Sequence, residues 1–209
     1  MSHYYDQSPE SASEIKTAAA EFDGREFIFA TDHGVFSRGH VDTGTTVLLQ
    51  AVIADLKNPE PRLPAPLKLL DLACGYGVLG IVLKRIFPAF DLTLTDVNER
   101  ALSLTQRNLE ANGVRYAEVA ASDGFAAIED QAYSVIVSNP PIRAGKPTVR
   151  QLMQDSYEHL HDGGRFYVVI GKKQGAASYS NYLADLFGQV DRIGRDQGFH
   201  VYRCIKRKE

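Results

Sequence analysis

The sequence has little cysteine, no long apolar run and no large excess of charge of either sign. Its 209 residues include two cysteines, Cys74 and Cys204. So few cysteines exclude a disulfide framework and a cysteine-rich zinc site, and they make a reducing compartment the default expectation. No apolar run approaches the roughly 18–20 residues of a membrane helix. The start of the chain also lacks the basic segment and apolar core of a signal peptide. We therefore expect a cytoplasmic protein that does not enter a membrane.

The charges nearly balance, but they are unevenly placed. The 23 basic and 26 acidic side chains sum to a net charge of −3, which excludes a strongly basic nucleic-acid module. Residues 138–154, however, contain Arg143, Lys146 and Arg150 and no acid. This distribution is compatible with a basic face on a mildly acidic body. The histidines form no grouping with metal-ligand spacing, so we predict no metal site.

Composition divides the chain into three parts. Residues 1–25 are polar and predict an N-terminal arm or a short edge element. Residues 26–66 form a lead-in that comprises a strand, a loop, a helix capped by Asp42 and a proline-rich linker. Residues 67–209 form the core, in which apolar strands alternate with helical segments. This alternation predicts an α/β fold with a mostly parallel sheet, covered on both faces and closed by an antiparallel pair.

A glycine-rich turn follows the first strand of the core. Gly75 to Gly80 match the pattern G-x-G-x-x-G, and Asp96 at the next strand end could accept hydrogen bonds from ribose hydroxyls. These features alone fit a dinucleotide, as in an NAD-dependent oxidoreductase, or a turn that serves packing only. Asp71 changes the balance, because a carboxylate four positions before Gly75 would repel a pyrophosphate. It suits instead the ammonium group of S-adenosylmethionine (SAM), which carries no phosphate.

Ser138-Asn139-Pro140-Pro141 follows the fourth core strand. An Asn-Pro step can simply end a strand. Together with the pattern Asp71-x-x-Cys-Gly-x-Gly77, however, it resembles class I SAM-dependent methyltransferases of the small-domain, N-P-P type. From about Phe27 to Ile205 the chain resembles those that methylate guanine N2 in 16S ribosomal RNA. The stretches that carry this likeness are 34–45, 139–146 and 199–203.

The resemblance implies a Rossmann-like sheet of seven strands with an antiparallel last strand, SAM as cofactor, and a set of site residues. The implied cofactor residues are Asp71, Ala73, Cys74, Gly75, Gly77, Asp96, Val97, Ser122, Asp123 and Asn139. Catalysis falls to Asn139, Pro140 and Pro141, because the Asn139 side-chain oxygen and the Pro140 carbonyl can accept the two N–H bonds of a planar amine. The implied substrate-binding residues are Phe36, Ile142, Arg143 and Lys146.

The implied partner is ribosomal RNA or the small ribosomal subunit, bound by a monomer or a dimer. One residue departs from the family, since N-P-P is commonly followed by an aromatic ring and Ile142 stands here. Phe36 and Phe125 are the candidate replacement rings. Two alternatives stay open: methylation of another planar nitrogen, in adenine N6 or protein glutamine, and a catalytically weak SAM-binding factor for ribosome assembly.

Overall fold

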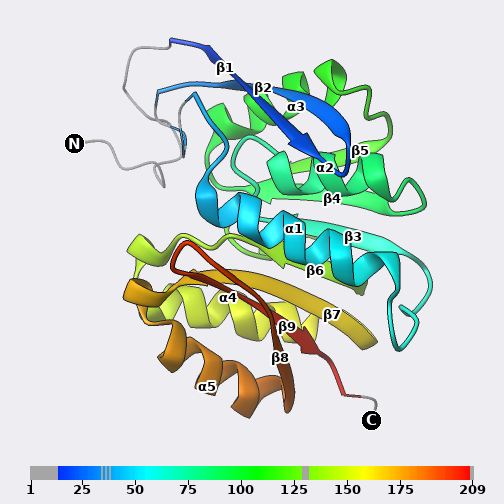
Figure 1. Ribbon diagram of the computed structural model, residues 1–209, viewed down its shortest axis with the longest axis vertical. Coiled ribbons are helices and arrows are strands. Elements are labelled where there is room, and N and C mark those ends of the chain that lie inside the picture. Colours follow the sequence, from blue (N-terminus) through cyan, green and yellow to red (C-terminus); the bar gives the residue numbers. More distant parts are fainter. Residues whose placement is uncertain (1–13, 34, 36, 38, 129–131, 208–209) are drawn as a thin grey trace.

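The computed structural model describes residues 14–33, 35, 37, 39–128 and 132–207. A central sheet of seven strands has the order β5-β4-β3-β6-β7-β9-β8 (Figure 1). The strands are β3 Lys68–Leu72, β4 Asp91–Asp96, β5 Ala117–Ala121, β6 Tyr133–Ser138, β7 Leu160–Gly171, β8 Gln189–Asp196 and β9 Phe199–Ile205. Within this sheet β9 alone runs opposite to the other six strands. The predicted fold class is therefore confirmed.

Strand alternation divides the apolar core into two layers. Leu69, Val135 and Val137 face one side of the sheet, whereas Leu70 and Ile136 face the other. The first layer is covered by α1 (Thr43–Lys57), α2 (Val78–Ile86) and α3 (Glu99–Ala111), and the second by α4 (Lys146–Glu158) and α5 (Ala176–Phe187). Two short 3-10 turns complete the helices: η1 (Ile142–Ala144) and η2 (Lys172–Gln174).

A hairpin of β1 (Lys16–Phe22) and β2 (Arg25–Thr31) packs beside α3 (Figure 1). Residues 16–22 thus form a strand in the region for which the sequence predicts an arm or a short edge element. Two asparagines of α3 bind the backbone of β2 as a neighbouring strand would. Asn108 bonds both the N–H and the carbonyl of Ala30, at 2.7 and 3.0 Å. Asn112 does the same for Ile28, at 3.1 and 2.8 Å.

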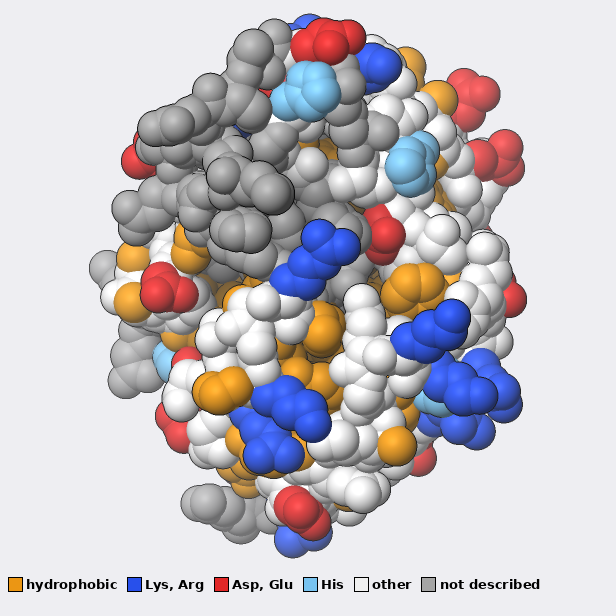
Figure 2. All heavy atoms as spheres, turned by 90° about the vertical axis from the view of Figure 1, so that its left-hand side faces the viewer, with side chains coloured by type: hydrophobic (Ala, Val, Ile, Leu, Met, Phe, Trp, Pro, Cys, Tyr) orange, Lys and Arg blue, Asp and Glu red, His pale blue; other side chains and the backbone are white. Residues whose placement is uncertain are grey.

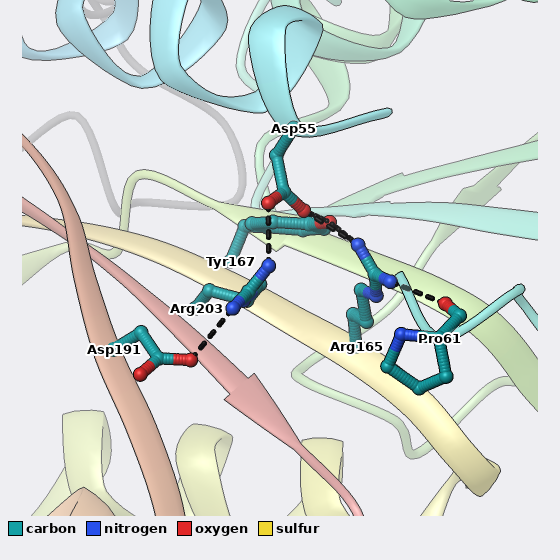
Figure 3. A network of polar contacts seen from close by, with 6 residues as sticks. All are labelled: Asp55, Pro61, Arg165, Tyr167, Asp191 and Arg203. Carbon is teal, nitrogen blue, oxygen red and sulfur yellow. Dashed lines mark hydrogen bonds and ion pairs between the residues drawn. The ribbon is translucent and has the colours of Figure 1, made fainter. Parts of the chain in front are cut away.

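Helix α1 joins the lead-in to the sheet. Its N-cap is Asp42, as predicted, whose side chain accepts a hydrogen bond from the backbone N–H of Thr45. Near its other end, Asp55 binds Arg165, Tyr167 and Arg203 of β7 and β9 (Figure 3). No helix of the described residues is long and apolar enough to cross a membrane.

The strand order reverses between β3 and β6. From β3 the chain proceeds to β4 and β5 on one side, then returns to add β6 on the other side of β3. Ligands of open α/β sheets bind beyond the carboxyl ends of the strands at such a switch point. The turns after β3 and β6, which carry both sequence motifs, meet at this position.

Candidate active site

A cavity of about 280 Å³ opens at the carboxyl ends of β3, β4 and β6. Figure 2 shows this face, with hydrophobic side chains in a central hollow and Lys and Arg side chains on either side. The residues that line the cavity are Asp42, Thr45, Leu72, Ala73, Cys74, Gly75, Tyr76, Val78, Leu79, Asp96, Val97, Ser122, Asp123, Gly124, Asn139, Pro141, Ala144, Thr148 and Leu152. Carboxylate and amide groups therefore share one opening with an apolar wall.

The glycine-rich turn is held in place by its backbone. The N–H of Cys74 donates to the Thr95 carbonyl at 2.8 Å, and the N–H of Gly75 donates to Asp96 Oδ2 at 2.8 Å. Gly77 has φ +88°, and a Cβ there would lie 3.0 Å from Thr105 Cγ2. Glycine is thus required at position 77 both for the left-handed backbone and for close packing.

Asp71 lies beneath this turn and does not line the cavity. The prediction that it reaches the ammonium group of the cofactor directly does not match its position, since its side chain is fully buried. Its Oδ2 accepts the N–H of Gly80 at 2.8 Å, and Oδ1 has no hydrogen-bond partner among the described residues. Burial raises the pKa of Asp71 to about 7, the Gly80 N–H lowers it, and the Asp96 charge raises it.

The next two strand ends supply the second wall. Asp96 accepts backbone N–H groups of Gly75 and Asn98 on its two oxygens. Burial raises its pKa, while these backbone bonds lower it. Ser122 donates to the carbonyl of Gly124 at 2.9 Å and so shapes the turn that presents Asp123 to the cavity. Both carboxylates can still accept hydrogen bonds from hydroxyl or amine groups.

Most of the predicted cofactor residues meet at this cavity. Those that line it are Ala73, Cys74, Gly75, Asp96, Val97, Ser122, Asp123 and Asn139, and those that do not are Asp71 and Gly77. Burial, followed by the charges of Asp71 and Asp96, raises the pKa of the Cys74 thiol. A raised thiol pKa disfavours the reactive thiolate, so Cys74 acts as a packing residue of the turn and not as a nucleophile.

Asn139 is oriented by the lead-in helix. Its amide nitrogen, Nδ2, donates to Asp42 Oδ2 at 3.1 Å and to Thr45 Oγ1 at 3.0 Å. Both N–H bonds of the amide are thereby used, so the side-chain oxygen is the group left to accept from a ligand. The sequence predicts Asp42 as a helix cap, and the family resemblance implies that residues 42–44 sit over the cofactor or the target base. The signal for its contact with Asn139 is absent from local patterns, because 97 positions separate them.

The two prolines lie differently. Pro141 lines the cavity, whereas Pro140 is buried behind it. The Pro140 carbonyl accepts the N–H of Ile142 at 2.8 Å, and Pro141 has φ −73° and ψ 78°, the values of an inverse γ-turn. The carbonyl that the sequence assigns to the substrate amine thus already holds one donor, and its second lone pair is the one available.

The predicted substrate residues lie at the rim or away from it. Ile142 is half-buried against the α4–α5 layer, and Arg143 and Lys146 are exposed. Phe125 is wrong as a stacking ring, because it packs in the core against His159 with ring centroids 4.2 Å apart. Phe36 lies outside the described residues.

Tyr76 is the one aromatic side chain among the described residues that line the cavity. Its hydroxyl donates to the His40 carbonyl at 3.1 Å. Burial raises its pKa, and the nearby Asp42 charge raises it further. The apolar wall of Leu72, Leu79 and Leu152 was also missed, because nothing local distinguishes these leucines from core residues.

The donor set fits SAM. Carboxylates at two neighbouring strand ends suit hydroxyl and amine groups, apolar side chains suit an adenine ring, and no described residue group has the composition of a metal site. A turn without side chains at Gly75 and Gly77 lets a ligand approach the backbone closely.

Known proteins support this assignment. Residues 26–203 match the Methyltransferase small domain family. The uncharacterized protein YbxB of Bacillus subtilis is 35% identical over 205 residues, which is 98% of each chain. Ribosomal RNA small subunit methyltransferase C of Shewanella amazonensis is 35% identical over 178 residues, which cover 83% of this chain and 48% of that protein. The Escherichia coli K12 protein of the same name is 33% identical over 180 residues, with 84% and 48% covered.

The chain spans about half the length of these two ribosomal RNA methyltransferases. Among solved structures, the 16S rRNA N2 methyltransferase of T. thermophilus, in complex with SAM and guanosine, superimposes with a TM-score of 0.81. The two are 27% identical, and the match covers 95% of this chain and 52% of the other. This chain belongs to the Methyltransferase small domain family and is a SAM-dependent methyltransferase.

Proposed function

We propose that the chain transfers a methyl group from SAM to the exocyclic N2 amine of a guanine in 16S ribosomal RNA. The observation that carries this proposal is the orientation of Asn139. With both amide N–H bonds held by Asp42 and Thr45, Asn139 offers an oxygen to the cavity, which is what an amine N–H donor needs. The likeness to the small-subunit methyltransferases and to the guanosine complex supports guanine as the base.

The residues of the cavity have separate tasks in this reaction. Asp96, Asp123 and the glycine-rich turn would hold the cofactor. SAM, when bound, supplies a methyl group on a sulfonium sulfur, which is a good electrophile. Asn139 therefore need not remove a proton beforehand; its oxygen accepts one N–H of the neutral amine and directs the nitrogen lone pair. The free lone pair of the Pro140 carbonyl can accept the other N–H, and the proton lost afterwards passes to water.

A target base must leave its stack to reach Asn139. The phosphates beside a flipped base would pass the cations at the cavity rim. Arg143, Lys146 and Arg150 are exposed on η1 and α4, which follow Pro141. Lys172, Arg192 and Arg195 lie near His200 and, after burial, lower its pKa. Figure 2 shows Lys and Arg side chains on both sides of the hollow.

The whole chain is nevertheless mildly acidic. We infer that the substrate is a shaped particle, the small ribosomal subunit or an assembly intermediate, more than free RNA. The oriented Asn139 amide and the intact Pro140-Pro141 pair count against a factor that only binds SAM. Ile142 in place of an aromatic ring counts against adenine N6 and glutamine as targets.

The test is methyl transfer from labelled SAM to purified small ribosomal subunits and to naked 16S ribosomal RNA, followed by nucleoside analysis. We expect N2-methylguanosine, formed faster on the subunit than on the RNA. N6-methyladenosine or labelled protein as the product would overturn guanine as the substrate. The subunits must come from cells that lack this enzyme, because subunits already methylated would give no label.

A further inference from the structure

We propose that Asp42 binds the N1–H of the target guanine, beside the N2 amine that Asn139 orients, and thereby selects guanine over other planar amines. This inference rests on the proposed function, because it concerns the base that enters the same cavity. It assigns to a helix-capping aspartate the role of a specificity residue.

The two oxygens of Asp42 have different surroundings. Oδ2 accepts the backbone N–H of Thr45 at 3.0 Å, the Thr45 hydroxyl at 3.5 Å and Asn139 Nδ2 at 3.1 Å. Oδ1 receives no hydrogen bond within the part of the chain that the structure describes, although Asp42 lines the cavity and is only half-buried. One oxygen is thus occupied by the protein, and the other is available to a ligand.

The neighbouring backbone keeps this carboxylate in place. A Cβ at Gly44 would lie 3.0 Å from Asp42 Oδ2 and 3.0 Å from Phe199 Cε1. Any larger residue at position 44 would push against Asp42 or against the start of β9. The glycine therefore lets Asp42 cap α1 and contact Asn139 at the same time.

Asp42 and Asn139 are hydrogen-bonded to each other and both line the cavity, so each contributes one free acceptor oxygen to it. The Watson–Crick edge of guanine carries two adjacent donor groups, N1–H and N2–H₂. Adenine places its N6 donors beside an N1 acceptor, and a glutamine side chain places its N–H₂ beside a carbonyl. With either of these ligands a lone pair would face the Asp42 carboxylate, which has no hydrogen to donate. Such mismatches discriminate far more strongly than differences in size.

The nucleosides guanosine and 2-aminopurine riboside both carry the 2-amino group, but only guanosine has a hydrogen on N1 and an oxygen on C6. The comparison of wild type with Asp42→Asn then separates the N1 contact from any effect of that oxygen. We would measure binding of each to the full chain saturated with S-adenosylhomocysteine, following 2-aminopurine fluorescence directly and guanosine by displacement. The wild-type protein should bind guanosine at least about 10-fold more tightly than 2-aminopurine riboside, because one hydrogen bond to a charged group contributes about that much to affinity.

Asp42→Asn is the decisive variant. Asparagine caps helices as well as aspartate does and can still accept from Asn139, so folding and SAM binding should not change. Its amide places a donor where Oδ1 was, and we expect the preference for guanosine to vanish or reverse. Thr45→Val is the matched control, because it removes one acceptor of Asn139 and leaves Oδ1 untouched. It should slow methyl transfer roughly 10-fold without changing the ratio of the two affinities.

The outcomes separate the two proposals. An unchanged affinity ratio in Asp42→Asn, while the wild-type protein forms N2-methylguanosine on small subunits, would overturn the role of Asp42 alone. A wild-type protein that binds guanosine no better than 2-aminopurine riboside would do the same. Failure to form N2-methylguanosine on unmethylated subunits would overturn the proposed function, and the inference with it.

Discussion

Helix α1 carries an aspartate at each end, and the two differ in what is left unbound. At its carboxyl-terminal end, both oxygens of Asp55 are occupied, by Arg165 and Tyr167 on one and by Arg203 on the other, each at 2.6 Å (Figure 3). At its amino-terminal end, Asp42 concentrates its protein donors on one oxygen, and the other has no donor in the described chain.

The difference separates structure from chemistry. Arg165 is fully buried and also donates to the Pro61 carbonyl at 2.5 Å, so the Asp55 cluster joins α1, the proline-rich loop and the sheet. A buried ion pair of this kind mainly makes its own disruption costly. The Asp42 cluster borders a cavity and retains acceptors, which is what a binding site needs. Similar residue types thus hold the fold at one end of a helix and line the cavity at the other.

The largest effect is expected from breaking the Asp55 cluster. Arg165→Met removes a buried cation and leaves Asp55 undercompensated, which should lower the free energy of unfolding by about 3–5 kcal/mol. Urea denaturation measures this loss. Methyl transfer per folded molecule should stay within about twofold of wild type, since the cluster does not line the cavity. Arg107→Met, at an exposed position on α3, is the control. A loss of activity at full stability would contradict the division between the two ends.

The converse change acts on the Asp42 cluster, to which Asn139 belongs. Asn139→Ala should lower the rate of methyl transfer at least about 100-fold, or about 2.7 kcal/mol, because the amine loses the group that orients it. SAM binding by calorimetry should persist, and the free energy of unfolding should change by less than about 1 kcal/mol. Full activity in this variant would exclude Asn139 from the mechanism.

A third carboxylate, Asp71, extends this comparison through the pH dependence of stability. Asp71 is buried like Asp55 but, like Asp42, has one oxygen without a protein donor. Its pKa is raised from 3.8 to about 7, so the folded state binds the proton more tightly than the unfolded state. The stability that protonation supplies is complete below about pH 4, falls as the pH rises from there, and is lost above about pH 7.

Without SAM, the wild-type protein should therefore lose roughly 2 kcal/mol of unfolding free energy between pH 5 and pH 8, compared with Asp71→Asn. Asparagine has no charge to bury and can still accept from Gly80. Urea denaturation of both proteins at the two pH values gives the comparison. Parallel pH profiles would mean that Asp71 titrates normally in the folded protein.

The sequence predicted what depends on local pattern. Strand ends and the glycine-rich turn located Asp96, Asp123 and Asn139, because carboxyl ends of parallel strands share one edge. The cap at Asp42 was also visible, since aspartate before a helical stretch accepts from the first turn. The sequence predicts an arm or a short edge element over residues 1–25, although the Asp23-Gly24 turn that pairs Lys16–Phe22 with β2 is itself a hairpin signal.

What was missed depends on contacts between distant elements. Asp42 meets Asn139, and Asp55 meets Arg165, only because α1 packs against β7 and begins beside the residue that follows β6. No periodicity indicates which face of a helix meets which strand end. Phe125 follows the turn at Asp123, which made it a plausible ring for the site, but its side chain packs in the core against His159. A position in sequence near the site does not determine whether a side chain points into the cavity or away from it.

The smallest effect is expected in the dependence of subunit binding on salt concentration, which distinguishes the exposed cations from the buried ones. Arg165 and Arg203 of the Asp55 cluster are enclosed. Arg143 and Lys146, which follow Asn139 closely in the chain, are exposed. Exposed charges are screened by salt and buried pairs much less.

Each phosphate contact contributes about 0.7–0.9 to the slope of log affinity against log salt. The double variant Arg143→Ala/Lys146→Ala should therefore bind small subunits roughly threefold to tenfold less tightly at low salt, with a slope reduced by about 1.4–1.8. Its unfolding free energy should equal that of the wild-type protein at every salt concentration. Arg107→Ala/Arg115→Ala removes two exposed cations, one on α3 and one in the connection between α3 and β5, and should change neither quantity. An unchanged slope in the first variant would remove Arg143 and Lys146 from the RNA-binding face and leave Lys172, Arg192 and Arg195, the cations near His200, to hold the phosphates.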